Sequence, residues 1–215
     1  MKNKFLTVFA VFDEATQKKL KSFQDSVLGL GCPGTQTMDI PFHISLGSFK
    51  VEDERELKAR IKSACSHQRA FEIRLQKVGH FSNRVLFIEP EENAPLRRLH
   101  DLFDGNFADG FPWHAHATIF CGEEAQVIKA KSRLDDIFVP IQGKITGIQM
   151  GEFFPTRMIS AEDFCERRQN MALPPFAENA PGRATNFCLP YPAIHRNRNS
   201  CPARNNASQN DTFFR

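Results

Sequence analysis

The same order of segments occurs twice in this chain of 215 residues. Each copy begins with an apolar run, continues through a stretch with helical spacing to a short strand-like run that contains a histidine, and ends with an amphipathic stretch and a further apolar run. The segments of the first copy are Phe5 to Phe12, Ala15 to Leu28, the run around His43, Glu52 to Ser66, and Phe71 to Val78. The segments of the second copy are Val85 to Ile88, Ala94 to Phe103, the run around His116, Glu123 to Phe138, and Ile141 to Met150. We therefore predict two β-α-β-α-β units in tandem.

A duplicated unit predicts two similar lobes related by an approximate two-fold axis. We expect residues 1–160 to form one α+β domain, with lobes at about 1–78 and 79–160. The expected fold is bilobal, with two antiparallel sheets that face a central cleft. The two histidine-containing runs would then lie symmetrically around that cleft.

Each of these two runs carries a histidine followed two residues later by a hydroxyl: His43 with Ser45, and His116 with Thr118. Side chains two positions apart on a strand point to the same face, so each strand presents an imidazole beside a hydroxyl. Among seven histidines, about one such pair is expected by chance. We interpret the third pair, in His80-Phe81-Ser82, as that chance match, because Gly, Ser and Asn around it are typical of a turn.

Two imidazoles on either side of one phosphate can open or close a phosphodiester without a metal ion. Their ordinary pKa, about 6.5, allows one ring to be neutral and the other protonated near neutral pH. The neutral ring deprotonates the nucleophile and the protonated ring gives a proton to the leaving oxygen. The hydroxyls of Ser45 and Thr118 would bind the nonbridging phosphate oxygens. This interpretation requires no cofactor and predicts a bell-shaped dependence of the rate on pH.

The two motifs in duplicated contexts resemble the two-histidine (2H) phosphoesterase superfamily, which includes bacterial 2′-5′ RNA ligases and cyclic phosphodiesterases. The resemblance extends over residues 1 to about 159 and includes Ile40-Pro41-Phe42 before the first motif and Trp113 before the second. It implies hydrolysis of 2′,3′-cyclic phosphates or of 2′-5′-linked nucleotides or RNA ends, together with reversible 2′-5′ RNA ligase activity. It also implies His116 as the base and His43 as the acid, with the roles exchanged in the reverse reaction. The chain has Phe120-Cys121-Gly122 where many members of the superfamily carry a basic residue.

Two other interpretations of the histidines remain open from the sequence. The same cleft could bind a nucleotide or an RNA end without turnover, as a non-catalytic module. Alternatively, His114 shares a strand face with His116, and with His43 the two could form the ligand set of a zinc hydrolase.

The aromatic and basic residues near the motifs also have two interpretations. Phe42 and Trp113 either belong to the core or line the cleft, where a nucleobase could stack on them. Arg84 and Arg157 are either partners for a phosphate or solvated surface arginines.

Composition limits the class of partner. A net charge of +3 gives no strong electrostatic signature of duplex binding, which favours a nucleotide or RNA end as the substrate. The six cysteines include no Cys-x-x-Cys, and the sequence contains neither a signal-peptide pattern nor an apolar run of about 20 residues. We therefore expect a cytoplasmic protein with no membrane partner and no obligate protein partner.

Residues 161–215 differ in composition from the rest of the chain. They contain no lysine and are rich in Pro, Asn and Arg without helical or strand periodicity. We predict a mostly disordered tail. Two alternatives are a weak basic arm that holds RNA and a read-through extension that was never selected with the domain.

Overall fold

The computed structural model describes residues 4–35, 40–103 and 112–165, and the statements below concern these residues. The elements of the first half are β1 (Phe5–Phe12), α1 (Glu14–Leu28), β2 (His43–Phe49), the 3₁₀ helix η1 (Val51–Asp53), α2 (Glu54–His67) and β3 (Phe71–Phe81). The elements of the second half are β4 (Val85–Pro90), α3 (Ala94–Leu102), β5 (Ala117–Cys121), α4 (Glu124–Ile137), β6 (Ile141–Phe153) and β7 (Arg157–Asp163). Both halves thus have the predicted β-α-β-α-β order, and β7 is an addition to the second.

Equivalent helices of the two halves begin in the same way. The side chain of Asp13 accepts a hydrogen bond from the backbone N–H of Thr16 at the start of α1, and Asn93 accepts one from Leu96 at the start of α3. A side-chain oxygen at this position satisfies one of the N–H groups that the first helical turn leaves unpaired. The two helices therefore start at equivalent places in the two copies.

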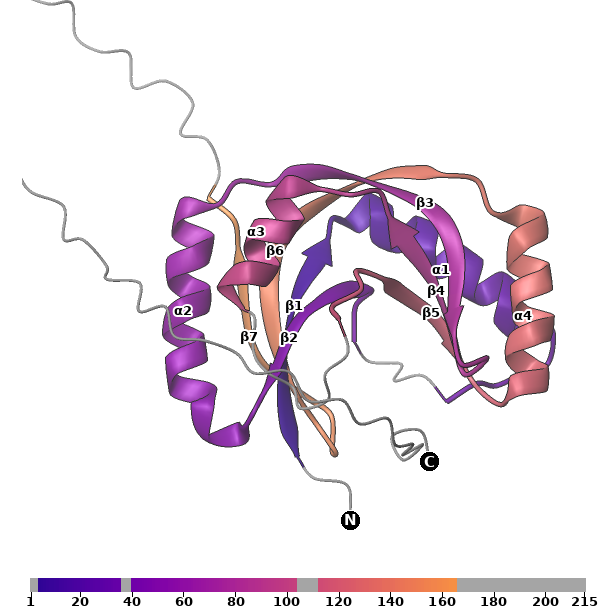
Figure 1. The fold of residues 1–215 in the computed structure, drawn as a ribbon, viewed down its shortest axis with the longest axis horizontal. Helices are drawn as coiled ribbons and strands as arrows, with labels where there is room; N and C mark the ends of the chain where they lie inside the picture. The colour runs from indigo at the N-terminus through magenta and orange to yellow at the C-terminus, as the bar shows by residue number, and fades with distance from the viewer. Residues whose placement is uncertain (1–3, 36–39, 104–111, 166–215) are drawn as a thin grey trace, which may run out of the picture. The chain divides into compact units, whose positions relative to one another are not determined.

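All seven strands form one antiparallel sheet with the order β2-β1-β6-β3-β4-β5, and β7 also pairs with β6. This order is symmetric between the two halves. When each strand is replaced by its equivalent in the other half (β1 by β4, β2 by β5, β3 by β6), the order reads the same from the opposite edge. A two-fold axis produces this symmetry. The two separate sheets expected from the sequence are in fact joined. The long strand β6 pairs with β3 through its first residues and with β1 through the rest, so that it connects both parts. Figure 1 shows β3 and β6 arching over the strands that carry the two histidines.

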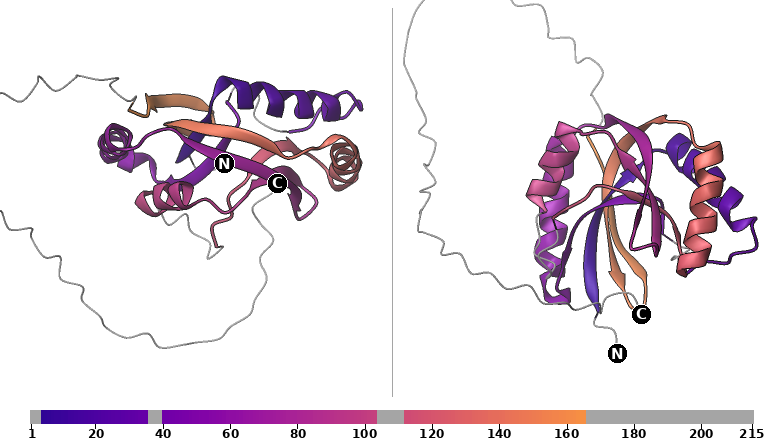
Figure 2. Two further views of the ribbon diagram at one scale, coloured as in Figure 1. Left: turned by 90° about the horizontal axis from the view of Figure 1, so that it is seen from above. Right: turned by 45° about the vertical axis from the view of Figure 1, so that its right-hand side comes forward.

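The α-helices lie in two groups at opposite sides of the molecule. Figures 1 and 2 show α2 and α3 together at one side of the molecule, and α1 and α4 together at the other. The edge strand β2 is contacted by α3, and the edge strand β5 by α1. Each edge is therefore covered by a helix from the opposite half, which protects its unpaired backbone groups. One core cluster contains residues from both halves.

The turn predicted around His80 is confirmed at Ser82 and Asn83, but the prediction that Gly79 belongs to it is wrong. Gly79 and His80 belong to β3, and the turn that follows is made by Ser82 and Asn83, whose φ angles are 44° and 50°. A Cβ at Gly79 would lie 2.5 Å from the ring of Phe87, so packing explains this glycine.

The end of the folded part also lies beyond residue 160. Strand β7 continues to Asp163 because it pairs with β6, and Phe164 is buried. The remainder of the predicted tail, from residue 166, lies outside the described residues. Within the described ranges, no helix combines the length and the apolar character that crossing a bilayer demands.

Candidate active site

The first half-site is built on β2, which begins at His43. Ile44 is fully buried while His43 and Ser45 are partly exposed, so the predicted alternation places the imidazole and the hydroxyl on one face. The imidazole packs on the ring of Phe9 with centroids 4.3 Å apart. Its Nδ1 lies 2.8 Å from the carbonyl oxygen of Pro41. A carbonyl can only accept, so Nδ1 carries a proton and Nε2 is the atom left to exchange one.

The second half-site repeats this arrangement at the start of β5. The Nδ1 of His116 donates to the carbonyl of His114, two residues upstream, at 2.8 Å. The rings of Phe87 and Phe81 pack against the imidazole, with centroids 5.0 and 4.9 Å away. Thr118 is partly exposed between fully buried neighbours and so lies on the same face as His116. Both imidazoles are therefore held in the same tautomer by the same local bond.

Both motif strands also carry a β-bulge at the same place. In the β1–β2 pair, Phe9 is opposite Ser45, and the register then shifts. In the β4–β5 pair, Phe87 is opposite Thr118, and the register shifts there too. A bulge bends its strand and re-aims nearby side chains, which explains how both strands present their motifs in the same way.

The sequence analysis missed Phe9 and Phe87 as parts of the site. Both are buried, and each lies beneath the histidine of its own half. Each is opposite the motif hydroxyl, Ser45 or Thr118, on the paired strand. This placement depends on pairing between strands, so the sequence alone contains no direct signal for it.

A cavity of about 680 Å³ brings residues of both motifs together. It is lined by His43, Ser45 and Thr118, and also by the predicted cleft residue Phe42. His116 and Trp113 are not among its lining residues. The other residues that line the cavity are Phe5, Thr7, Gln17, Lys18, Lys21, Gln24, Ile40, Pro41, Ser48, Cys121 and Phe153.

Burial controls the proton affinity of both imidazoles. It lowers the pKa of His43 to about 4, although the hydrogen bond to Pro41 opposes the change and the nearby charge of His116 reinforces it. Burial also lowers the pKa of His116, and the bond to His114 and the carboxylate of Glu89 oppose that effect. The carboxylate of Glu89 lies 3.4 Å from the Nε2 of His114. Burial and a neighbouring imidazole thus lower the pKa of each ring, with His116 acting on His43 and His114 acting on His116, and an acidic neighbour opposes this at His116.

Trp113 ties the second motif to the strand of the first. Its Nε1 donates to the carbonyl of Ser45 at 2.9 Å. Its ring stacks on His100 with centroids 4.0 Å apart and planes 4° from parallel, and the guanidinium of Arg97 lies 5.2 Å from the ring centre. The Nδ1 of His100 donates in turn to the carbonyl of Leu46 at 2.8 Å. The structure therefore places Trp113 in a contact between the halves.

A reciprocal contact joins the other half-site to α1. The Nε2 of Gln24, which is buried, donates to the carbonyl of Ile119 at 3.0 Å. Ile119 occupies the same position after His116 that Leu46 occupies after His43. Each bulged strand is thus bonded by a side chain from the helix of the opposite half.

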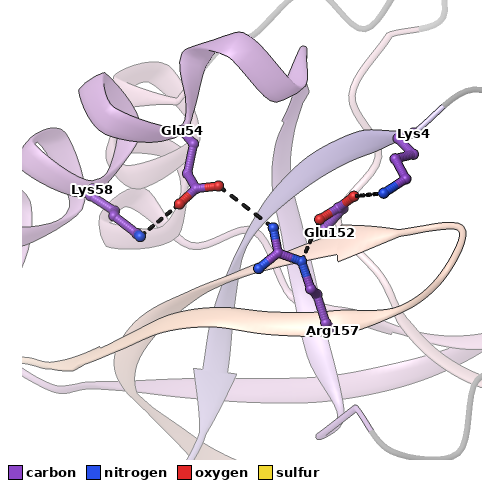
Figure 3. Close-up of polar contacts among 5 residues, drawn as sticks. All are labelled: Lys4, Glu54, Lys58, Glu152 and Arg157. Carbon is purple, nitrogen blue, oxygen red and sulfur yellow. Dashed lines mark hydrogen bonds and ion pairs between the residues drawn. The ribbon is translucent and has the colours of Figure 1, made fainter.

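The two candidate arginines are paired with carboxylates. Arg84 pairs with Glu123. Arg157 pairs with Glu152 at 2.5 Å and with Glu54 at 3.8 Å (Figure 3).

The candidate zinc ligands do not form a metal site. Across residues 4–35, 40–103 and 112–165, no group of three His, Cys, Asp or Glu side chains is arranged to hold a metal ion. His43, His114 and His116 all lie in these ranges. The zinc interpretation of the three histidines therefore loses its geometric basis.

Comparisons with known proteins agree with this architecture. The model of the 2′-5′ RNA ligase superfamily matches residues 31–152, a range that includes both motifs. The crystal structure of E. coli LigT in apo form has a TM-score of 0.52 and 14% identity, over 77% of this chain and 100% of that one. E. coli LigT complexed with 3′-AMP gives a TM-score of 0.50, with the same identity and coverage. TT0787 of Thermus thermophilus gives a TM-score of 0.51 at 16% identity, over 74% of this chain and 97% of that one. No curated protein sequence matches the chain.

Proposed function

Because the chain belongs to the 2′-5′ RNA ligase superfamily of two-histidine phosphoesterases, we propose that it hydrolyses 2′,3′-cyclic phosphates or 2′-5′-linked nucleotides and RNA ends without a metal ion. Reversible 2′-5′ RNA ligation is the second activity that we propose for the same site. The observation that carries this proposal is the repetition of one half-site: a histidine with Nδ1 fixed on a carbonyl, a hydroxyl two residues on, and a phenylalanine beneath the ring. The 3′-AMP complex of the structurally similar LigT supports a nucleotide as the ligand.

The proposed reaction moves two protons around one phosphorus atom. Water attacks the cyclic phosphate in line with the leaving oxygen, a new P–O bond forms, and the P–O bond to the leaving oxygen breaks. The Nε2 of His116 takes the proton from water, and the Nε2 of His43 gives its proton to the leaving oxygen. Both Nδ1 atoms are already engaged with carbonyls, so each ring exchanges protons through Nε2.

The surroundings of the two rings support this assignment. Burial lowers the pKa of His43 to about 4, which makes its protonated form the stronger proton donor. Burial lowers the pKa of His116 as well, and the carboxylate of Glu89 opposes this lowering, so that ring keeps more of its strength as a base. The negative charge of a bound phosphate would favour the protonated form of His43 at the moment when it is needed.

The hydroxyls of Ser45 and Thr118 complete the site. Both line the same cavity as His43. We propose that they donate hydrogen bonds to the nonbridging oxygens, where negative charge grows in the transition state.

The test is the hydrolysis of 2′,3′-cyclic nucleotides in EDTA, with the 2′- and 3′-phosphate products resolved. The parent should form a single isomer, and His43→Ala and His116→Ala should each lower turnover about 1,000-fold. His80→Ala is the matched control, since His80 is exposed and belongs to the third His-x-Ser pair, which we interpret as fortuitous. We expect this variant to retain the activity of the parent.

The same measurement distinguishes the alternatives. Binding of 3′-AMP that survives both substitutions, with no turnover by the parent, would favour the non-catalytic nucleotide-binding module. Turnover that occurs only when zinc is added would contradict the metal-independent mechanism.

A further inference from the structure

The cavity that contains His43 extends along β1 to an aromatic end. Phe9, Thr7 and Phe5 alternate along β1 and so point to the same face as the histidine. Phe5 is opposite Phe153 of β6, and their rings are stacked with centroids 5.3 Å apart and planes 11° from parallel. Both Phe5 and Phe153 line the cavity. We call this pair the aromatic platform.

Small and polar residues separate the platform from the histidine. The hydroxyls of Thr7 and Ser48 lie 3.2 Å apart, and both residues line the cavity. Gly151 is opposite Thr7 on the neighbouring strand and adds no side chain there. From Phe9, beneath His43, to Phe5 is four residues of strand, or about 13 Å at roughly 3.3 Å per residue. The cavity is therefore elongated, with the motif residues toward one end and the platform at the other.

Charge is distributed unevenly along the cavity. Lys18 and Lys21 of α1 line it, and their partners are the exposed carboxylates of Glu14 and Asp25, one helical turn away. Exposed pairs of this kind are weak, so both lysines can exchange their partner for a phosphate.

The cations at the platform are held by a buried carboxylate. Lys4 and Arg157 bind the two oxygens of Glu152 at 2.9 and 2.5 Å, and Arg157 also pairs with Glu54 (Figure 3). Glu152 is 1% exposed, and the two cations hold the pKa of its carboxyl below the ordinary value. Lys4, Glu152 and Arg157 are not among the residues that line the cavity, so its platform end is aromatic rather than charged.

The same ion cluster fixes the platform mechanically. Lys4 directly precedes Phe5, and Glu152 directly precedes Phe153. The ion pair between Lys4 and Glu152 therefore joins β1 and β6 at the residues next to the two that carry the stacked rings. A fixed aromatic surface loses little conformational entropy when a flat ligand binds to it.

We propose that the aromatic platform binds the base of the nucleotide next to the reacting one, so that the substrate is an oligonucleotide with at least two bases. This inference rests on the proposed function, since it places the reacting phosphate at His43 and Ser45. The base of the reacting nucleotide is joined to that phosphate through a single sugar and does not reach Phe5. The preceding nucleotide is one phosphate further along the chain, and its base can reach Phe5.

The test compares three substrates that share the same reacting end. These are adenosine 2′,3′-cyclic phosphate, the dinucleotide ApA that ends in the same cyclic phosphate, and that dinucleotide with an abasic first residue. We expect kcat/KM to be about tenfold higher for ApA than for either of the others, as stacking of one base supplies. Phe5→Leu should remove this advantage of the dinucleotide over the other two substrates, whereas Phe5→Tyr should retain it.

A binding measurement separates the platform from the catalytic proposal. Calorimetry with 3′-AMP and with ApAp, the corresponding dinucleotide 3′-phosphate, requires no turnover. The parent should bind ApAp about tenfold more tightly than 3′-AMP. The Phe5→Leu variant should bind the two ligands with equal affinity. An equal affinity of the parent for the two ligands, or a dinucleotide advantage that persists in Phe5→Leu, would overturn the inference. Absence of turnover with tight, Phe5-dependent binding of ApAp would instead count against the proposed hydrolysis.

Discussion

The two half-sites share one scaffold but differ in what surrounds their imidazoles. In both, a carbonyl two residues upstream holds Nδ1 and a phenylalanine from the paired strand supports the ring. Beyond this scaffold, His116 has a second phenylalanine, another imidazole and a carboxylate nearby. For His43 the influences on its pKa are burial, the hydrogen bond to Pro41 and the repulsion of His116. The shared scaffold therefore explains the common geometry of the pair, while different neighbours act on the pKa values of the two rings.

The largest effect should come from replacing each histidine in turn. Loss of a general acid or base should lower kcat about 1,000-fold in His43→Ala and in His116→Ala. A cyclic substrate with sulfur in place of the leaving oxygen needs no proton donor, because a thiolate leaves readily. This substrate should restore turnover to His43→Ala alone. Restoration in His116→Ala instead would reverse the assignment of acid and base.

Removing either of the two hydroxyls should lower kcat to a similar extent, because the two half-sites share one scaffold. Ser45→Ala and Thr118→Val each remove one donor to the phosphate oxygens, and each should lower kcat about 100-fold. Steady-state kinetics with a cyclic nucleotide measures this effect, and thermal unfolding serves as the control for folding. A loss confined to one of the two variants would show that the phosphate lies in one half-site only.

Removing the hydrogen bonds between the two halves should have smaller effects on kcat. Trp113→Phe retains an aromatic ring but leaves the carbonyl of Ser45 without its donor, and Gln24→Leu does the same to Ile119. Each variant should lose about 1 to 3 kcal/mol of unfolding free energy in urea. Each should also lower kcat about tenfold, because a catalytic strand is displaced. A variant that keeps the kcat of the parent while losing stability would reduce its bond to a purely structural role.

The smallest expected change is in the dependence of kcat/KM on pH, which reports the different surroundings of the two rings. Below both pKa values no imidazole can act as a base, and above both none can act as an acid, so kcat/KM should follow a bell. Because both pKa values are lowered from 6.5, the maximum should lie below that pH. Glu89→Gln removes a charge that raises the pKa of His116, and should therefore move the bell to lower pH. A rate that rises monotonically from pH 5 to 9 would contradict the use of a histidine pair.

Much of this comparison could be predicted from the sequence because it depends on short-range patterns. The order of elements follows from apolar periodicity, and the helix starts follow from Asp13 and Asn93. The presentation of each histidine with its hydroxyl follows from the two-residue repeat of a strand. These signals lie within a few residues of one another.

The remaining features depend on residues that are distant in the sequence. The joining of two expected sheets into one follows from the length of β6 and its partners on both sides. The contact of Trp113 with Ser45 spans 68 positions, and that of Gln24 with Ile119 spans 95. The pairing of Arg157 with Glu152 needs the turn into β7, which the apolar pattern does not reveal. A single sequence contains no signal for such contacts.

The covering of each edge strand by a helix from the opposite half has a consequence for synthesis of the chain. β2 leaves the ribosome before α3, so its outer edge stays without the donors of His100 and Trp113 while the second half is still being made. An uncovered edge is a template for pairing with other chains, so this interval is when the nascent protein is most exposed to aggregation. In the proposed mechanism each half supplies only one of the two histidines. Appearance of activity during translation would therefore mark completion of the fold, and would lag behind the formation of compact structure.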